Sequence, residues 1–193
     1  EGKFSFIAPQ VRKRTSFSIT ANLVNEAGTK FNVSAQSLIL PSKPNLIVIF
    51  TDDQGYADIG VHNIVQDINT PNIDKLAANG VLFTNGYITA PQCTPSRAGM
   101  VTGVYQQRFG VDDNRYTPIP ENVVTMGDRY SDLGYTTGMV GKWHLEVDQN
   151  SKPWFKENFP NTPISEFNPG KLPSSLKERY YPSSKGYKYN YFG

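Results

Sequence analysis

The stretch Cys93-Thr94-Pro95-Ser96-Arg97-Ala98-Gly99-Met100-Val101-Thr102-Gly103 decides how the chain around it is organised. Pro95 suits the first turn of a helix, where its missing N–H is no loss. Gly103 is a suitable residue to end a helix. The stretch therefore predicts a helix that begins near Cys93 and places its sulfur where free N–H groups favour negative charge. Arg97 adds a fixed cation nearby.

Cys93 is the only cysteine of the sequence, so it forms no intrachain disulfide. A lone cysteine is commonly a buried and inert thiol. Its surroundings, however, resemble the signature of the type I sulfatases, Cys-x-Pro-Ser-Arg followed by an apolar pair and Thr-Gly, although Gln92 departs from the residue usual before the cysteine. In that family a maturation enzyme oxidises the cysteine to formylglycine, whose hydrated aldehyde is the nucleophile. The resemblance implies this role for Cys93 and a formylglycine-generating enzyme as a partner.

A continuous apolar run, Leu46–Phe50, is typical of a buried parallel strand and leads into Asp52 and Asp53. Carboxylates at the C-terminal end of such a strand lie where open α/β sheets bind ligands, although adjacent acids also form turns. Sulfatases hold a divalent cation on such a pair of aspartates. The resemblance therefore implies a site for Ca²⁺, with Mg²⁺ as an alternative, on Asp52, Asp53 and the oxidised Cys93.

A second resemblance lies in Gly141-Lys142-Trp143-His144-Leu145, which matches the family's Gly-Lys-Trp-His-Leu, followed here by Glu146 where the family usually has Gly. In extended backbone, Lys142 and His144 point to the same side. The resemblance implies that Arg97 and Lys142 neutralise charge on the sulfate and that His144 exchanges a proton. For Glu146 we expect only a local loop difference.

The remaining pattern predicts an α/β fold. Caps and apolar spacing predict helices from Pro71 to Gly80 and from Thr125 to Leu133, with strands at 81–83 and 135–140. The resemblance implies part of an alkaline-phosphatase-like, mostly parallel sheet flanked by helices, over residues 45–193. Before it we expect a β-rich segment at 1–40 and a linker at 41–44. Alternation on either side of 25–28 predicts a hairpin, either the end of an immunoglobulin-like module or a hairpin of other origin.

Two further segments leave alternatives open. Residues 104–121 are polar and line either a substrate cleft or a solvated loop; the candidates are Arg108, Asp112, Asp113, Asn114 and Arg115. Residues 152–179 form either a plain surface loop or a basic, aromatic lip that grips an anionic glycan. The sequence alone does not choose between these.

The formal net charge of +2 argues against nucleic acid and membrane surfaces as partners, and no apolar run approaches the roughly 20 residues of a membrane span. No signal peptide is visible. The family resemblance implies a periplasmic, cell-surface or secreted protein that acts on a sulfated glycan or another sulfate ester. Sulfatases also use downstream metal and sulfate ligands that this sequence lacks, so we expect an N-terminal part of a longer enzyme that does not turn over alone. The alternatives are a phosphonate or phosphodiester hydrolase of the same superfamily and a non-catalytic structural or adhesive protein.

Overall fold

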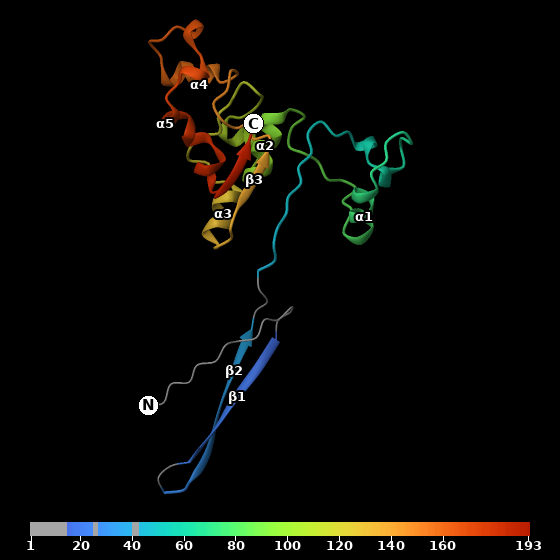
Figure 1. Ribbon diagram of the computed structural model, residues 1–193, viewed down its shortest axis with the longest axis vertical. Coiled ribbons are helices and arrows are strands. Elements are labelled where there is room, and N and C mark those ends of the chain that lie inside the picture. Colours follow the sequence, from blue (N-terminus) through green and yellow to red (C-terminus); the bar gives the residue numbers. More distant parts are fainter. Residues whose placement is uncertain (1–14, 25–26, 40–42) are drawn as a thin grey trace. The chain divides into compact units, whose positions relative to one another are not determined.

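The structure is a computed structural model of the 193-residue chain and describes residues 15–24, 27–39 and 43–193. The chain divides into two compact units, residues 1–51 and 52–193 (Figure 1). The strands are β1 (Thr15–Val24), β2 (Lys30–Ile39), β3 (Gly138–Gly141) and β4 (Tyr189–Phe192). The α-helices are α1 (Pro71–Asn79), α2 (Cys93–Thr102), α3 (Met126–Asp132), α4 (Lys152–Asn158) and α5 (Ser174–Lys177). Single turns of 3-10 helix lie at Tyr56–Asp58, Gly60–His62, Gln106–Phe109, Ile164–Glu166, Pro169–Lys171, Glu178–Tyr180 and Pro182–Lys185.

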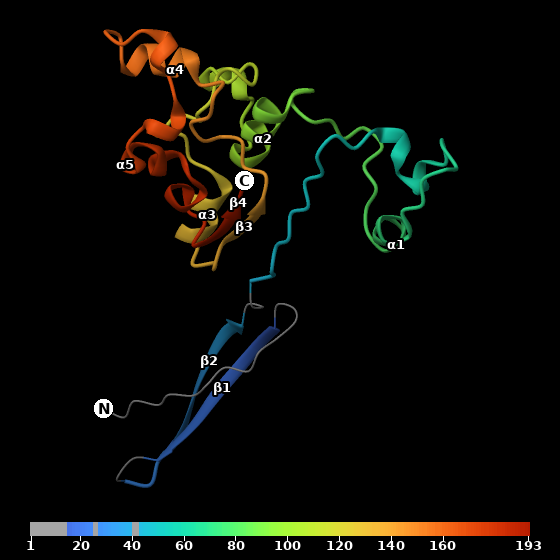
Figure 2. The same ribbon diagram turned by 45° about the horizontal axis from the view of Figure 1, so that its top comes forward.

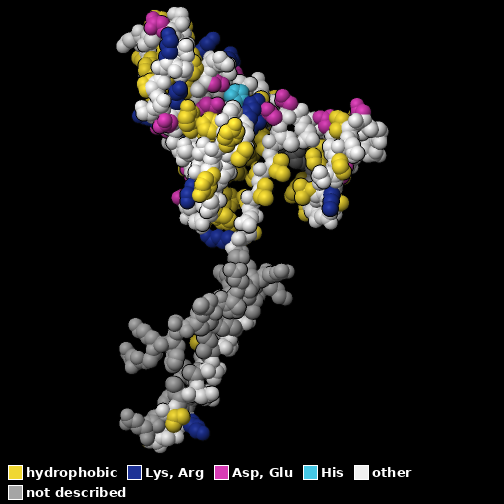
Figure 3. All heavy atoms as spheres, viewed as in Figure 1, with side chains coloured by type: hydrophobic (Ala, Val, Ile, Leu, Met, Phe, Trp, Pro, Cys, Tyr) yellow, Lys and Arg dark blue, Asp and Glu magenta, His cyan; other side chains and the backbone are white. Residues whose placement is uncertain are grey.

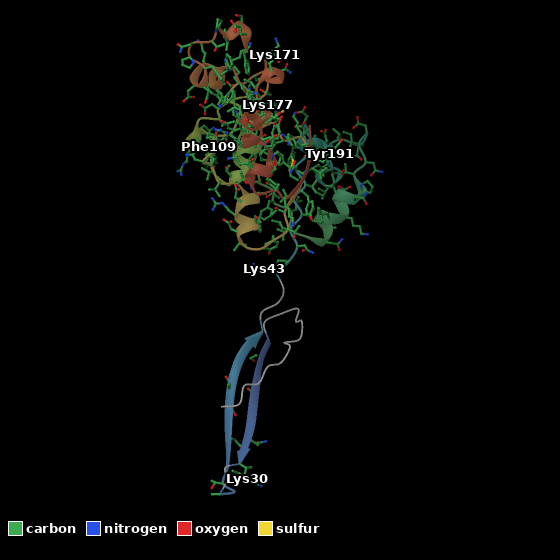
Figure 4. All side chains as sticks on the ribbon, turned by 60° about the vertical axis from the view of Figure 1, so that its left-hand side comes forward. Lys30, Lys43, Phe109, Lys171, Lys177 and Tyr191 are labelled. Atoms are coloured by element: carbon green, nitrogen blue, oxygen red, sulfur yellow. The ribbon has the colours of Figure 1, made fainter. Side chains whose placement is uncertain are left out.

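The first unit contains the predicted hairpin. Strands β1 and β2 pair antiparallel along their whole lengths, and Thr20 and Ser34 join their hydroxyls at 3.0 Å across the pair. Lys30, the first residue of β2, lies at the turn end of the hairpin (Figure 4). The hairpin is confirmed, whereas an immunoglobulin-like module remains a prediction. Parts of the predicted turn and linker, at 25–26 and 41–42, lie outside the described residues.

The predicted strand at Leu46–Phe50 is wrong for this structure. The segment is in no sheet, and the side chains of Ile47 and Ile49 are 83% and 79% exposed. A strand needs a hydrogen-bonded neighbour, and none of the described strands pairs with this run. The predicted strand at 81–83 is wrong for the same reason.

In the second unit, the helices begin and end at the predicted residues. Pro71 opens α1, and Gly103 ends α2 in the left-handed conformation with φ +67°. Thr125 caps α3 through a reciprocal capping box with Asp128. Thr70 occupies the cap position of α1, but its hydroxyl accepts from Gly60 N and donates to Asp74 instead. Proline, glycine and capping residues thus set the ends of α1, α2 and α3.

The two short strands of the second unit form the parallel pair that an α/β fold requires. Gly138 pairs with Tyr189 and Gly141 with Phe192, so β3 and β4 run side by side in one direction (Figure 2). The core beside them gathers buried residues from α2, from the segment after it and from the segment after β3: Ala98, Val101, Val111, Ile119, Trp143, Leu145 and Tyr187. Helix α2 is buried along most of its length, which fixes the position of its first residue.

Residues 152–179 are not a plain loop, and the basic, aromatic lip remains a prediction. They form short helices around aromatic side chains that pack on one another: Phe155 lies 5.0 Å from Phe159 and 4.6 Å from Phe167, between ring centroids, and Trp154 meets Tyr180 edge-on at 5.8 Å. Aromatic pairs of this kind stabilise beyond their burial. The aromatic residues therefore build a small core of their own.

A buried lysine ties the segment just before β4 to the segment between α2 and α3. The Lys185 side chain is 2% exposed, and its ammonium donates to the backbone carbonyls of Pro120, Glu121 and Val123 at 3.1, 2.8 and 3.3 Å. Its own carbonyl accepts from the Thr125 hydroxyl at 2.8 Å. These bonds anchor the chain just before β4.

The surface of the second unit also carries exposed apolar side chains over α1 and over the β3–β4 pair (Figure 3). Leu76 of α1, Val140 of β3 and Tyr191 of β4 are 68%, 82% and 81% exposed. None of the helices in the described parts of the chain has the length and hydropathy needed to cross a membrane.

Candidate active site

The site is built on the first turn of α2. Cys93 is the first helical residue, and Ser96 donates from its hydroxyl to the Cys93 carbonyl at 3.0 Å. Thr94 is fully buried and binds two other segments: its N–H donates to Asn114 Oδ1 at 3.0 Å, and its hydroxyl donates to the His144 carbonyl at 3.1 Å. The start of the helix is therefore fastened to two other segments of the chain.

Asp52 lies between two cations. Arg97 Nη2 is 3.0 Å from Asp52 Oδ1, and Lys142 Nζ is 2.9 Å from Asp52 Oδ2. Hydrogen bonds from Lys142 first, and then from Arg97, hold the pKa of Asp52 below its usual value. The bond to Asp52 in turn raises the pKa of Lys142. Arg97 is 7% exposed and also donates from Nη1 to the Lys142 carbonyl at 2.6 Å, which joins α2 to the end of β3.

The same lysine reaches the cysteine. Lys142 Nζ lies 3.3 Å from Cys93 Sγ, and the sulfur lies 3.9 Å from Asp52 Oδ1. Four residues predicted from separate parts of the sequence, Asp52, Cys93, Arg97 and Lys142, thus meet in one place. An anionic group at Cys93 would have two cations beside it.

Asp53 completes a candidate cation site. One ligand atom from each of Asp52, Asp53 and Cys93 lies within 4.8 Å of the others. Asp53 adopts φ +52°, an uncommon conformation for a residue with a side chain. Two carboxylates suit a hard cation such as Ca²⁺, and oxygen atoms in place of the sulfur would suit it better. Because Ca²⁺ takes six to eight ligands, these residues fit such an ion as one part of its coordination shell.

His144 does not join the others as the strand argument predicts. Strand β3 ends at Gly141, and His144 adopts φ +54°, so the alternation of an extended chain does not reach it. Its Nε2 lies 3.3 Å from Asp148 Oδ2, and its Nδ1 is buried without a hydrogen-bond partner in the described part of the chain. The ring therefore makes no hydrogen bond to Cys93 among the described residues.

The departure at Glu146 has a local effect, as expected. Its carboxylate turns back and accepts from the Leu145 N–H at 2.9 Å. The glutamate thereby satisfies a backbone donor in its own loop.

The polar segment after α2 contributes one residue that the sequence argument left undecided. Asn114 holds the start of α2, whereas its neighbours Asp113 and Arg115 pair with each other at 2.6 Å, and the Arg115 side chain is 73% exposed. Asp148 was missed altogether. Its one signal in the sequence is its position four residues after His144.

Comparison with known proteins places this site in context. The family model described as Sulfatase matches residues 44–191. The chain is 46% identical over 107 residues to N-acetylgalactosamine-6-O-sulfatase of Bacteroides thetaiotaomicron, covering 53% of this chain and 21% of that protein. It is 41% identical over 118 residues to Arylsulfatase A of Homo sapiens, covering 58% and 23%. Among solved structures, the crystal structure of Ps i-CgsB matches with a TM-score of 0.58 and 31% identity, over 79% of this chain and 29% of that one. The chain spans about a fifth of the length of these curated relatives.

Proposed function

Because the chain belongs to the sulfatase family, whose model matches residues 44–191, we propose that it forms part of a sulfuric ester hydrolase. The observation that carries the proposal is the double contact of Lys142, whose ammonium lies 3.3 Å from Cys93 Sγ and 2.9 Å from Asp52 Oδ2. This contact joins the predicted nucleophile, a predicted metal ligand and a predicted sulfate-binding cation. A purely structural role would not need a lysine that is 35% exposed at that point.

The cationic and the acidic side chains of the site have different roles. Arg97 and Lys142 are fixed in advance by Asp52 and by backbone contacts, so they are ready to stabilise negative charge on sulfate oxygens as the S–O bond breaks. Asp52 and Asp53 would hold the divalent cation, Ca²⁺ or Mg²⁺. Oxidation of Cys93 to formylglycine would supply a hydrated aldehyde as nucleophile, and the cation would supply Lewis acidity. His144 is the proton partner in this proposal.

A sulfated carbohydrate is the substrate class we propose. The support is the similarity to a relative named N-acetylgalactosamine-6-O-sulfatase, 46% identical over 107 residues. The surface lysines of 152–179, among them Lys171 (Figure 4), would suit an anionic glycan through their charge. A formylglycine-generating enzyme as partner and a periplasmic, cell-surface or secreted location belong to the same proposal.

The first test is mass spectrometry of the Cys93 peptide from the native source. Conversion of the thiol to an aldehyde lowers its mass by about 18 Da. An unmodified thiol in that sample would refute the formylglycine nucleophile.

The second test compares hydrolysis of an aryl sulfate and an aryl phosphonate by protein from the same source. Faster sulfate turnover supports the proposal, and faster phosphonate turnover would assign the chain to the other hydrolase class. Lys142→Met should lower sulfate turnover by about a hundredfold or more, the usual effect of losing one transition-state donor. Lys75→Met, an exposed lysine in α1, is the matched control and should leave turnover unchanged.

A further inference from the structure

Asp148 and His144 form a pair that the family signature does not contain. Asp148 lies in the segment between β3 and α4, and its Oδ2 is 3.3 Å from His144 Nε2. The two side chains are only 20% and 19% exposed. The contact is therefore largely shielded from water, where a hydrogen bond to a charged group is stronger than at the surface.

Asp148 is itself held firmly in place. Its Oδ1 accepts from the Thr117 hydroxyl at 2.9 Å and from Asn150 N at 2.7 Å, and its Oδ2 accepts from Asn150 Nδ2 at 3.1 Å. Its own N–H donates to Ser151 Oγ at 3.0 Å. Burial raises the pKa of Asp148, but hydrogen bonds from His144, Asn150 and Thr117 outweigh it and bring the pKa to about 2. At neutral pH the group is thus an ionised carboxylate, which only accepts hydrogen bonds.

An acceptor-only partner dictates where the histidine proton lies. A neutral imidazole carries one N–H, and the nitrogen that faces a carboxylate must be the donor. Nε2 faces Asp148, so in the neutral ring the lone pair lies on Nδ1. Nδ1 is buried and has no hydrogen-bond partner in the described residues. A buried polar atom of this kind is unfavourable and calls for an explanation.

The backbone supports the same orientation. His144 is held at φ +54°, a conformation that is rare for residues with a side chain and that recurs at functional sites. Its carbonyl accepts from the hydroxyl of Thr94, the residue next to Cys93. The ring is thus anchored beside the first turn of α2 from its backbone and fixed in rotation from Asp148.

We propose that Asp148 is a positioning residue that holds the neutral His144 ring with its proton on Nε2, so that Nδ1 is the nitrogen available to accept a proton. The part assigned to Nδ1 rests on the function proposed above. The tautomer does not, because it is a property of the chain without substrate.

The test is ¹⁵N NMR of the full chain labelled at histidine. The sequence has only His62 and His144, so the His62→Gln variant assigns every ring signal of His144. Spectra are recorded about two pH units above the ordinary histidine pKa of about 6.5, where an unperturbed ring is neutral. We expect a ring N–H resonance on Nε2 of His144, protected from exchange by the carboxylate. Asp148→Ala should abolish that resonance, whereas Ser151→Ala, which removes a neighbour of Asp148 but leaves the carboxylate, should retain it.

Either of two results would overturn the proposal: a proton on Nδ1 in the wild-type chain, or an undiminished Nε2–H resonance in Asp148→Ala. If Asp148→Ala does not fold, the wild-type tautomer alone decides. Loss of sulfate-ester hydrolysis in the native protein would remove the role of Nδ1 but would leave the NMR result intact, so the two failures are distinguishable.

Discussion

We expect even Gly99→Ala, the smallest substitution possible in the middle of α2, to destabilise the protein. A Cβ atom added to this residue would overlap Thr89 Oγ1 and would lie 3.1 Å from Thr89 Cβ and 3.0 Å from Gln106 Oε1. Gln106 is fully buried and holds the Thr89 carbonyl through Nε2 at 3.3 Å, so it has little freedom to retreat. The close approach of residue 89 to the helix that carries Cys93 thus requires a glycine.

The expected loss is a balance of two terms. In an open helix, Gly→Ala stabilises by about 0.5–1 kcal/mol. Forcing an extra methyl group into a packed core costs about 1–3 kcal/mol. We therefore expect Gly99→Ala to lower the free energy of unfolding by about 1–2 kcal/mol.

Urea unfolding followed by tryptophan fluorescence measures this loss, because Trp143 is 1% exposed and lies in the core that α2 joins. The matched test is a double-mutant cycle with Thr89→Ala, which removes the hydroxyl in the way. Thr89 Oγ1 is buried without a hydrogen-bond partner in the described residues, so this change alone should cost little. Gly99→Ala should then cost less in the Thr89→Ala background, by about 1 kcal/mol. An equal cost in both backgrounds, or a Gly99→Ala chain as stable as wild type, would refute the packing argument.

Three further predictions concern single charged groups. The pKa of Asp148 falls from 3.8 to about 2 on folding. The ionised carboxylate therefore adds about 2 kcal/mol to the free energy of unfolding above pH 4, and this contribution is lost as the pH falls towards 2. The difference in free energy of unfolding between wild type and Asp148→Asn, measured with urea, should narrow over that range. Lys185→Met removes the donor from three partly buried carbonyls and should lower the free energy of unfolding by about 2–3 kcal/mol. Lys171→Met, at an exposed position, should change that free energy by less than about 0.5 kcal/mol. In calorimetric titration with Ca²⁺, Asp53→Asn should weaken binding by about tenfold or more, and Asp67→Asn, an exposed control, should not; equal affinities would argue against the cation site.

Local chemistry is what the sequence predicts well. Pro71, Thr125 and Gly103 act within one helical turn, so the bounds of α1, α2 and α3 follow from a few neighbouring residues. The resemblance in turn brings together residues that are distant along the chain, and Asp52 and Lys142 do meet at Cys93.

Strand pairing between distant segments and unusual backbone dihedral angles are not predicted by the sequence. The run Leu46–Phe50 has the composition of a buried strand, but a strand exists only beside a partner. The alternation of an extended chain predicts that His144 points to the same side as Lys142, and a single dihedral angle, φ +54° at His144, makes that rule inapplicable. The aromatic residues of 154–167 have no regular period because they pack around short turns, so their spacing does not predict a core.

The pairing of β3 with β4 has a consequence for the order in which the chain folds. Gly138 can pair only after Tyr189 has been made, and residues 142–188 separate the two strands along the chain. Contacts so far apart in sequence are slow to form, whereas the aromatic core of 154–167 closes over short distances. On a ribosome, the lysine-anchored turn at Lys185 emerges just before β4 and has its carbonyl acceptors at 120–123 already available. We therefore expect the segment around Lys185 to be fastened before β4 pairs with β3, so that sheet closure is the last step in this part of the molecule.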